Sequence, residues 1–471
     1  MKNQRQLTTI KIMLSSRTII FKLARHKQRG AALMVMLIIM TLGSAAFLVS
    51  ALNSSSVQIE RDKKTADALA QAKNALIGYA ASVALTPAGT KRPGDLPCPD
   101  INNDGSADTP CNGNALGRLP WKTLGLPDFR DSSGERLWYA VSANFKNSPR
   151  TATLNSDTLG SISVFAKDGN LSYDGGATGT GVIAVLIAPG AVLQRTDKIT
   201  PQDRSSVGSN NPVNYLDIAL GQDNASFTDG LSTDGLIQGI IKDSNQRVIL
   251  NDQLLVITQE NIMRAIQKRV AAEVKQCLNE YASDPQNNGR LPWSSRVRDT
   301  GTPPSYSDRS GYLFGRIPDS PFKKTCEDSG GGGCDQPAQS GGMWNNWRGN
   351  CNIASLSGWW LNWKEMTFYA LADAYKPVDP ITAAAVNACS TTGACLSVNP
   401  PSATTDKKFA VIVAGKMLPG QSRSTNIEKG TFSNYLEAPN PVPPYSATPV
   451  NPTSFSQGVT SATFNDAVSF Q

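Results

Sequence analysis

Oxygen-bearing side chains at alternate positions make one stretch of the chain a candidate site for a hard cation. The stretch is DINNDGSAD, residues 100–108. Carboxylate and amide oxygens spaced in this way, with a glycine for the turn, are typical of calcium-binding loops. Such loops close on a bidentate glutamate, but Cys111 occupies that position, so a solvated Asx-rich turn held by a Cys98–Cys111 disulfide is the alternative. The predicted calcium ligands are Asp100, Asn102, Asp104 and Asp108.

Histidine, which Ser-His-Asp, Cys-His and many metal sites require, is almost absent from the chain. Its only histidine, His26, lies in a basic N-terminal segment. This excludes Ser-His-Asp and Cys-His catalysis and histidine metal sites from the remainder. The glycine run Gly330–Gly333 is not followed by Lys-Ser/Thr, so it does not match a phosphate-binding loop. We predict that the protein is not an enzyme, with no catalytic residues and no certain cofactor.

Cysteine spacing predicts disulfides. All eight cysteines lie beyond residue 97, and none forms a C-x-x-C pair. An even number of cysteines on an exported segment favours disulfides over a zinc site. Pairing sequence neighbours gives Cys98–Cys111, Cys326–Cys334, Cys389–Cys395 and, by remainder, Cys277–Cys351.

A cluster of tryptophans in the C-terminal half is a second candidate site. Trp344, Trp347, Trp359, Trp360 and Trp363 fall within 20 residues. Trp359, Trp360 and Trp363 could stack on the sugars of a glycan. Alternatively, they fill the core of a disulfide-rich lobe.

An uncharged segment near the N-terminus is long enough to anchor the chain in a membrane. Residues 31–52 carry no charge, and eight Lys and Arg with no acidic residue occupy residues 1–30. A helix of this length covers about 33 Å, enough for a bilayer core, and the basic flank predicts a cytoplasmic N-terminus. Without residues 1–30 the net charge changes from +7 to 7 − 8 = −1. The excess of basic residues therefore belongs to this N-terminal segment, and it gives no reason to expect nucleic-acid binding.

The order of basic leader, Gly30 and apolar run resembles the signal of type IV prepilins and type II secretion pseudopilins. The resemblance implies cleavage between Gly30 and Ala31 by a prepilin peptidase, followed by N-methylation. Major subunits of that family carry glutamate at the fifth mature position, where this chain has Val35, so it is closer to K-type minor members. The alternative is a signal anchor that is never cut.

The pattern beyond the apolar run predicts one long helix and then a repeat. Ala66, Leu69, Ala72, Leu76 and Tyr79 recur at helical spacing, so the helix extends to about residue 82. A second amphipathic helix starts after Thr258, and short motifs then recur in the same order. The recurring pairs include Gly117–Trp121 with Gly289–Trp293 (both GRLPW), Ala184–Ala188 with Ala410–Ala414, Asn214–Asp217 with Asn434–Glu437, and Asn251-Asp252 with Asn465-Asp466.

These observations predict an α+β fold: a long N-terminal transmembrane, pilin-like helix followed by two tandem pilin-like lobes with small, mainly antiparallel sheets. The predicted boundaries are 1–30 for the leader, 31–52 for the membrane span, 53–257 for lobe 1 and 258–471 for lobe 2. We expect a single-pass inner-membrane protein with a periplasmic bulk. The resemblance implies a minor pilin or pseudopilin at or near a filament tip, with the membrane, prepilin peptidase and other minor pilins as partners. A membrane-anchored binding protein or adhesin that uses the tryptophans is the alternative function.

Overall fold

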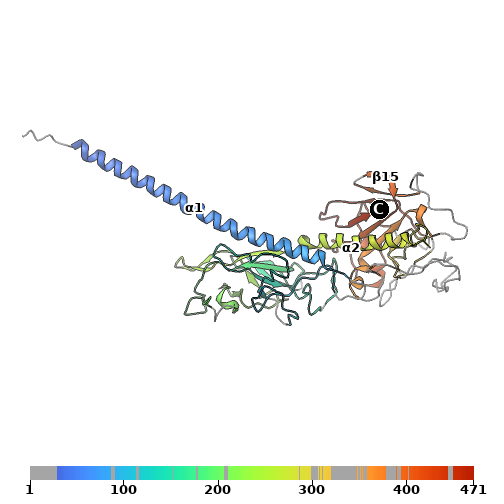
Figure 1. Cartoon of the computed structure of the whole chain (residues 1–471), viewed down its shortest axis with the longest axis horizontal. Coiled ribbons are helices and arrows are strands. Elements are labelled where there is room, and N and C mark those ends of the chain that lie inside the picture. Colours follow the sequence, from blue (N-terminus) through green and yellow to red (C-terminus); the bar gives the residue numbers. More distant parts are fainter. Residues whose placement is uncertain are drawn as a thin grey trace, which may run out of the picture. The chain divides into compact units, whose positions relative to one another are not determined.

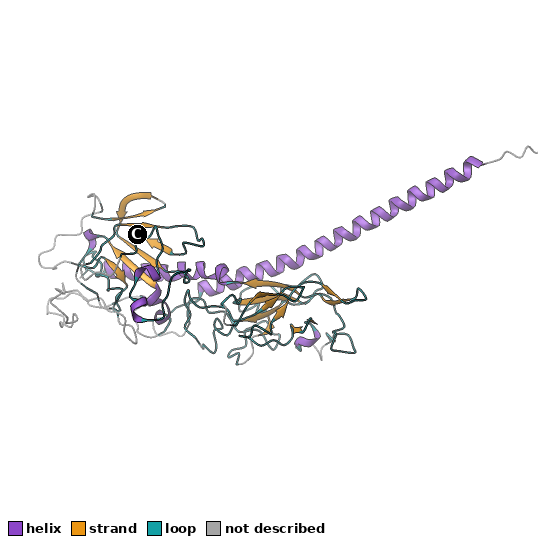
Figure 2. Ribbon diagram, turned by 180° about the vertical axis from the view of Figure 1, so that it is seen from behind, coloured by secondary structure: helices purple, strands orange, loops and turns teal. Residues whose placement is uncertain are grey.

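The protein is described from a computed structural model, and it divides into two compact units, Met1–Glu60 and Arg61–Gln471. Figure 1 follows the chain by colour and Figure 2 shows its helices and strands. The structure describes residues 29–85, 91–112, 116–150, 152–176, 179–205, 210–285, 287–298, 306, 308–309, 311–319, 347, 351, 353, 358–377, 389, 394–400, 402–443 and 449–471.

Helix α1 (Arg29–Ser82) is one continuous helix of 54 residues. No proline interrupts it, and in its C-terminal part small and aliphatic residues recur every three or four positions. These residues are buried in a hydrophobic core together with Tyr139 and Leu186 of the first sheet. The predicted extension of the helix to residue 82 is confirmed. The buried stripe consists of Ala68, Leu69, Ala72, Leu76 and Ala80.

The transmembrane part of the predicted fold is corrected by the structure. Among the described residues, no helix is both long enough and apolar enough to cross a bilayer. Further along α1, five charged residues follow in succession, Glu60 to Lys64, so that part of the helix cannot be placed in hydrocarbon without a large cost. Within residues 31–52, side-chain exposure is described only for Met36, Met40 and Thr41. The fold is therefore a mixed α/β arrangement with several small sheets.

The first sheet has four antiparallel strands in the order β1 (Leu116–Arg118), β2 (Trp138–Val141), β5 (Ala184–Ala188) and β11 (Gln253–Ile257). Alternate residues of a strand point to opposite faces. Tyr139 and Leu186 accordingly belong to the core that contains α1, whereas Trp138 and Ile187 pack with Tyr215 in a second core. The sheet is thus buried on both faces.

Helix α2 (Gln259–Ser283) begins the second lobe. Thr258 and Asn261 form a capping box at its start, which confirms Thr258 as the N-cap and agrees with its place before the apolar stripe. The predicted stripe is buried along its whole length: Ile262, Ile266, Val270, Val274, Cys277 and Tyr281. Helix α2 contacts the second four-stranded antiparallel sheet, ordered β12 (Phe314–Arg316), β13 (Thr367–Leu371), β16 (Phe409–Val413) and β18 (Ala467–Phe470).

Smaller elements complete the described part. In lobe 1 they are β3 (Val164–Phe165), β4 (Leu171–Tyr173), β6 (Ile218–Ala219), β7 (Gln222–Asp223), β8 (Leu236–Ile237), β9 (Ile241–Lys242), β10 (Val248–Leu250) and the 3₁₀ turn η1 (Pro212–Asn214). In lobe 2 they are β14 (Leu396–Asn399), β15 (Ser402–Lys407), β17 (Ser454–Ser456), α3 (Trp360–Trp363), α4 (Asn426–Lys429), η2 (Lys364–Met366), η3 (Asp373–Tyr375) and η4 (Phe432–Asn434).

The two four-stranded sheets have the same register as well as the same order. Arg118 pairs with Trp138 in the first sheet, and Arg316 pairs with Phe368 in the second. The matching segments are therefore Gly117–Pro120 (GRLP) and Gly315–Pro318 (GRIP). An internal duplication with a boundary at residues 257 and 258 stays a prediction, which this shared register supports.

The identical GRLPW pentapeptides do not occupy equivalent places. Tyr139 Oη donates to the carbonyl of Pro97 at 3.2 Å, and its counterpart Tyr369 donates to the carbonyl of Pro292 at 3.1 Å. The second pentapeptide therefore corresponds to the segment around Pro97, not to Gly117–Trp121. The match of Ala184 with Ala410 is likewise displaced by one residue, because Ala410 pairs with Ala370 as Val185 pairs with Ala140.

Candidate functional site

Main-chain N–H groups hold the conformation of the acidic loop, residues 100–108. Asp100 is 1% exposed. One of its carboxylate oxygens accepts the N–H groups of Asn103 and Asp104 at 2.6 and 3.2 Å, and the other accepts that of Gly105 at 2.7 Å. Burial raises the pKa of Asp100, while these amide donors act in the opposite direction. The carboxylate therefore closes a turn, as in an Asx motif.

The other predicted ligands are used in the same way. Asp108 accepts the N–H groups of Ile101 and Asn102 at 2.6 and 3.1 Å, and Asp104 accepts that of Ser106 at 2.6 Å. The Ser106 N–H holds the pKa of Asp104 below its usual value. In the described part of the chain, no three acidic, cysteine or histidine side chains are grouped so that they could hold a metal ion. This geometry agrees with the Asx-rich turn, and calcium at the loop stays a prediction.

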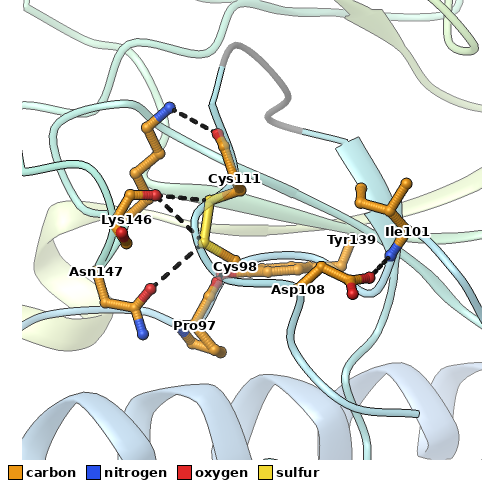
Figure 3. The surroundings of a disulfide bond; sticks show 9 residues. Pro97, Cys98, Ile101, Asp108, Cys111, Tyr139, Lys146 and Asn147 are labelled. Atoms are coloured by element: carbon orange, nitrogen blue, oxygen red, sulfur yellow. Dashed lines mark hydrogen bonds between the residues drawn. A yellow bond between two sulfur atoms is a disulfide. The ribbon is translucent and has the colours of Figure 1, made fainter. Parts of the chain in front are cut away.

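A disulfide fastens the two ends of this loop. Cys98 and Cys111 are bonded, with their Cα atoms 5.7 Å apart. Figure 3 shows Lys146 and Asn147 beside the sulfur atoms, and Lys146 Nζ donates to the carbonyl of Cys111 at 3.4 Å. On the other side, Asp108 holds the main chain at Ile101. The loop is thus fixed by covalent and polar contacts that need no cation.

The predicted disulfide pattern is confirmed as far as it is described. The structure pairs Cys98 with Cys111, Cys277 with Cys351, and Cys389 with Cys395. Cys326 and Cys334 lie outside the described residues. Cys277–Cys351 is the only one of the three that joins distant segments, and it attaches the buried face of α2 to the loop before α3.

The tryptophans predicted as a glycan platform are core residues. Trp359, Trp360 and Trp363 are 0%, 1% and 0% exposed. Their neighbours include Tyr369 and Leu371 of the second sheet. A fully buried ring has no face available to a sugar, so the structure agrees with the core alternative. The spacing of the tryptophans along the sequence identified the cluster, but it did not indicate whether the rings are buried or exposed.

A pair of arginines surrounds one tyrosine in each lobe, which the sequence analysis missed. The guanidinium carbons of Arg118 and Arg204 lie 3.9 and 5.0 Å from the centroid of the Tyr215 ring. In lobe 2, those of Arg316 and Arg423 lie 4.6 and 4.3 Å from the Tyr435 centroid. Such cation–π contacts stabilise a buried guanidinium. The repeated Asn-Tyr-Leu-Asp/Glu motif marked the two tyrosines, and GRLPW contains Arg118, but no motif marked Arg204, Arg316 or Arg423.

Two buried acidic pairs accompany these tyrosines. In lobe 1, Asp217 accepts the N–H of Asn251 at 2.9 Å, and Asp252 accepts the N–H of Asp217 at 2.9 Å. Glu437 and Asp466 repeat this pattern in lobe 2. Burial raises the pKa of Asp217 to about 6 and that of Asp252 well above its usual value. The role of both pairs in the structure is to link the strand that ends each lobe to the preceding turn.

The predicted processing residues lie at the start of α1. Gly30 and Ala31 are its second and third residues, and nothing is described of their exposure. Further along the helix, residues 56–64 are exposed on every side. Val57 and Ile59 are 49% and 68% exposed. These exposed apolar side chains are available for association with another chain.

Comparison with known proteins gives no further assignment. Neither a protein-family model, nor a curated protein, nor a solved structure matches the chain.

Proposed function

We propose that the protein is a non-enzymatic minor subunit of a filament of the type IV pilus or type II secretion pseudopilus kind. Its N-terminal helix would be the element through which it assembles with other minor subunits. The observation that carries this proposal is that two parts of α1 differ in burial. From Ala68 onward the helix is a core element of lobe 1, whereas the side chains of residues 56–64 are exposed.

Three further features support an exported assembly subunit. Disulfides are typical of extracytoplasmic proteins, and the structure forms three of them. The sequence before Ala31 has the order of a prepilin leader. The acidic loop, the disulfides and the repeated Tyr–Arg stacks make their contacts within the fold. The tryptophan-based adhesin is not carried forward, because the rings on which it depends are buried.

The test is the mass of the full chain expressed with and without a prepilin peptidase. We expect loss of residues 1–30 only when the peptidase is present, and a full-length product from Gly30→Leu under both conditions. Gly78→Ala is the matched control, since Gly78 lies in the same helix with open space around its Cα, and it should be processed like the wild type. An uncut N-terminus with the peptidase present would rule out the filament pathway.

A second experiment tests the association surface itself. Val57→Asp with Ile59→Asp should abolish co-purification with other minor subunits, because charges would replace apolar contacts. The thermal midpoint should stay unchanged, because both side chains are exposed. Lys63→Gln, an equally exposed position on the same helix, serves as control. Unchanged co-purification of the double variant would show that this surface does not mediate assembly.

A further inference from the structure

Lobe 1 contains a cavity of about 370 Å³ beside the first sheet. It lies on the face of the sheet that carries Trp138, and η1 and the segment after β7 complete its walls. This volume is at the lower end of the range found for small-molecule sites. The residues that matter for its chemistry are Asp100, Arg118, Trp138, Asn210, Phe227 and Asp229.

Comparison of the two lobes explains why space is left here. At the corresponding place in lobe 2, Phe314 stacks on Phe432 with ring centroids 4.7 Å apart, and Phe455 lies 5.5 Å from Phe314. The register places Leu116 where lobe 2 has Phe314, and the 3₁₀ turns place Pro212 where it has Phe432. Smaller residues at these two positions leave a hollow in lobe 1 that aromatic rings fill in lobe 2.

Asp229 and Trp138, which line the cavity, each have a buried polar atom with no hydrogen-bond partner within the described part of the chain. Asp229 uses one carboxylate oxygen to accept the N–H of Ala143 at 2.8 Å, and its other oxygen accepts no hydrogen bond. Trp138 is 2% exposed, and its Nε1–H likewise has no acceptor. Buried donors and acceptors left unpaired cost free energy, so each of these atoms is suited to a ligand group. The site thus needs a ligand that both donates and accepts.

Two of the charged groups at the cavity, Arg118 and Asp100, are already engaged within the protein. The guanidinium of Arg118 lies 4.3 Å from the Trp138 ring centroid and donates to the carbonyl of Arg136 at 3.1 Å. The Asp100 carboxylate is occupied by main-chain N–H groups. Asp229 adds a further carboxylate, so a strong anion is not favoured, and its one unpaired oxygen suits a hydroxyl donor. A neutral ligand whose hydroxyl groups can donate and accept meets these requirements.

We propose that this cavity binds a neutral sugar of about one ring. A sugar hydroxyl donates to the open oxygen of Asp229, and another accepts the Nε1–H of Trp138. The C–H face of the ring packs on the half-buried side chain of Phe227. The cavity belongs to lobe 1, so it is independent of the tryptophan cluster of lobe 2 and of the assembly role of α1.

The experiment is saturation-transfer NMR and calorimetry on the full chain. The neutral probes are D-glucose, D-galactose, D-mannose and N-acetyl-D-glucosamine, and the charged probes are acetate and L-arginine. We expect at least one neutral sugar to bind and both charged probes to fail. Asp229→Asn should weaken that binding about tenfold or more, since an amide NH₂ replaces the acceptor oxygen. Leu116→Phe, which introduces the ring found in lobe 2, should abolish it.

Asp243→Asn is the matched control, because it makes the same chemical change at an exposed turn of lobe 1 outside the cavity. It should bind the sugar like the wild type. Circular dichroism must show the same fold for all three variants. The proposal is overturned if no neutral sugar binds, if only a charged probe binds, or if binding survives in a folded Leu116→Phe protein.

Discussion

Asp217 donates its main-chain N–H to the carboxylate of Asp252 at 2.9 Å, so two acidic residues share one buried network. Asn224 adds a second donor to Asp252 at 2.8 Å. Arg195 and Arg204 lie near Asp217 and lower its pKa, but burial has the larger effect and raises it to about 6. Burial and the nearby Asp217 charge raise the pKa of Asp252 well above its usual value.

This network predicts a stability that falls as the pH rises. The folded-state pKa values lie above those of the unfolded chain, so unfolding releases protons above about pH 4. The contribution of the pair is therefore complete below about pH 4 and declines as the pH rises through about 6. We expect Asp252→Asn to raise the free energy of unfolding at pH 8 by roughly 1–3 kcal/mol and to change it little at pH 4.5. Urea unfolding at the two pH values measures both numbers, and equal effects at both would contradict the assignment.

The two central arginines should differ in their contribution to stability. Arg316 is completely buried and donates to the carbonyls of Glu365 and Lys429. Arg118 occupies the same register position but borders the lobe 1 cavity. We expect Arg316→Gln to lower the free energy of unfolding by about 3–5 kcal/mol and Arg118→Gln by about 1–2 kcal/mol. Chemical denaturation of the two variants tests this, and an equal or larger effect at Arg118 would contradict the prediction.

The disulfides should rank by the length of chain that they close. Cys277–Cys351 closes a separation of 74 residues, whereas Cys389–Cys395 closes one of 6. In the chain-entropy description, their removal costs about 4 and about 2 kcal/mol. We expect the double alanine variant of the first pair to have the lower denaturation midpoint, measured under oxidising conditions. The reverse order would mean that native packing, and not chain entropy, determines the effect.

The acidic loop gives a prediction about cations. Asp100 already accepts three main-chain N–H groups, so removing it leaves buried donors unpaired. Asp100→Ala should lower the free energy of unfolding by about 1–3 kcal/mol. If the loop is the Asx-rich turn, closed by its own N–H groups, EDTA and added calcium leave the thermal midpoint of the wild type unchanged. A midpoint that rises with calcium and falls with EDTA would instead establish the calcium site.

Local sequence patterns predicted those structural features that depend on residues close together in the chain. The stripe from Ile262 to Tyr281 is buried, because residues three and four apart lie on one face of a helix. Cys98 and Cys111 pair, because a short loop brings its own ends together. The recurring Asn-Tyr-Leu motif correctly marked Tyr215 and Tyr435, since the same turn is used twice.

Only the tertiary structure shows which side chains are buried and which of the repeated segments occupy equivalent places. Trp359 could have been surface or core, and its sequence neighbourhood is the same in both cases. The identical GRLPW segments are not equivalent, because Arg118 is fixed by pairing with Trp138, and that register is set by contacts across the sheet. The acidic network joins Asp217 to Asp252 across 35 residues. The sequence by itself determined the two long helices and the nearby cysteine pairs, and it predicted a repeat. Packing between distant segments determined which side chains meet.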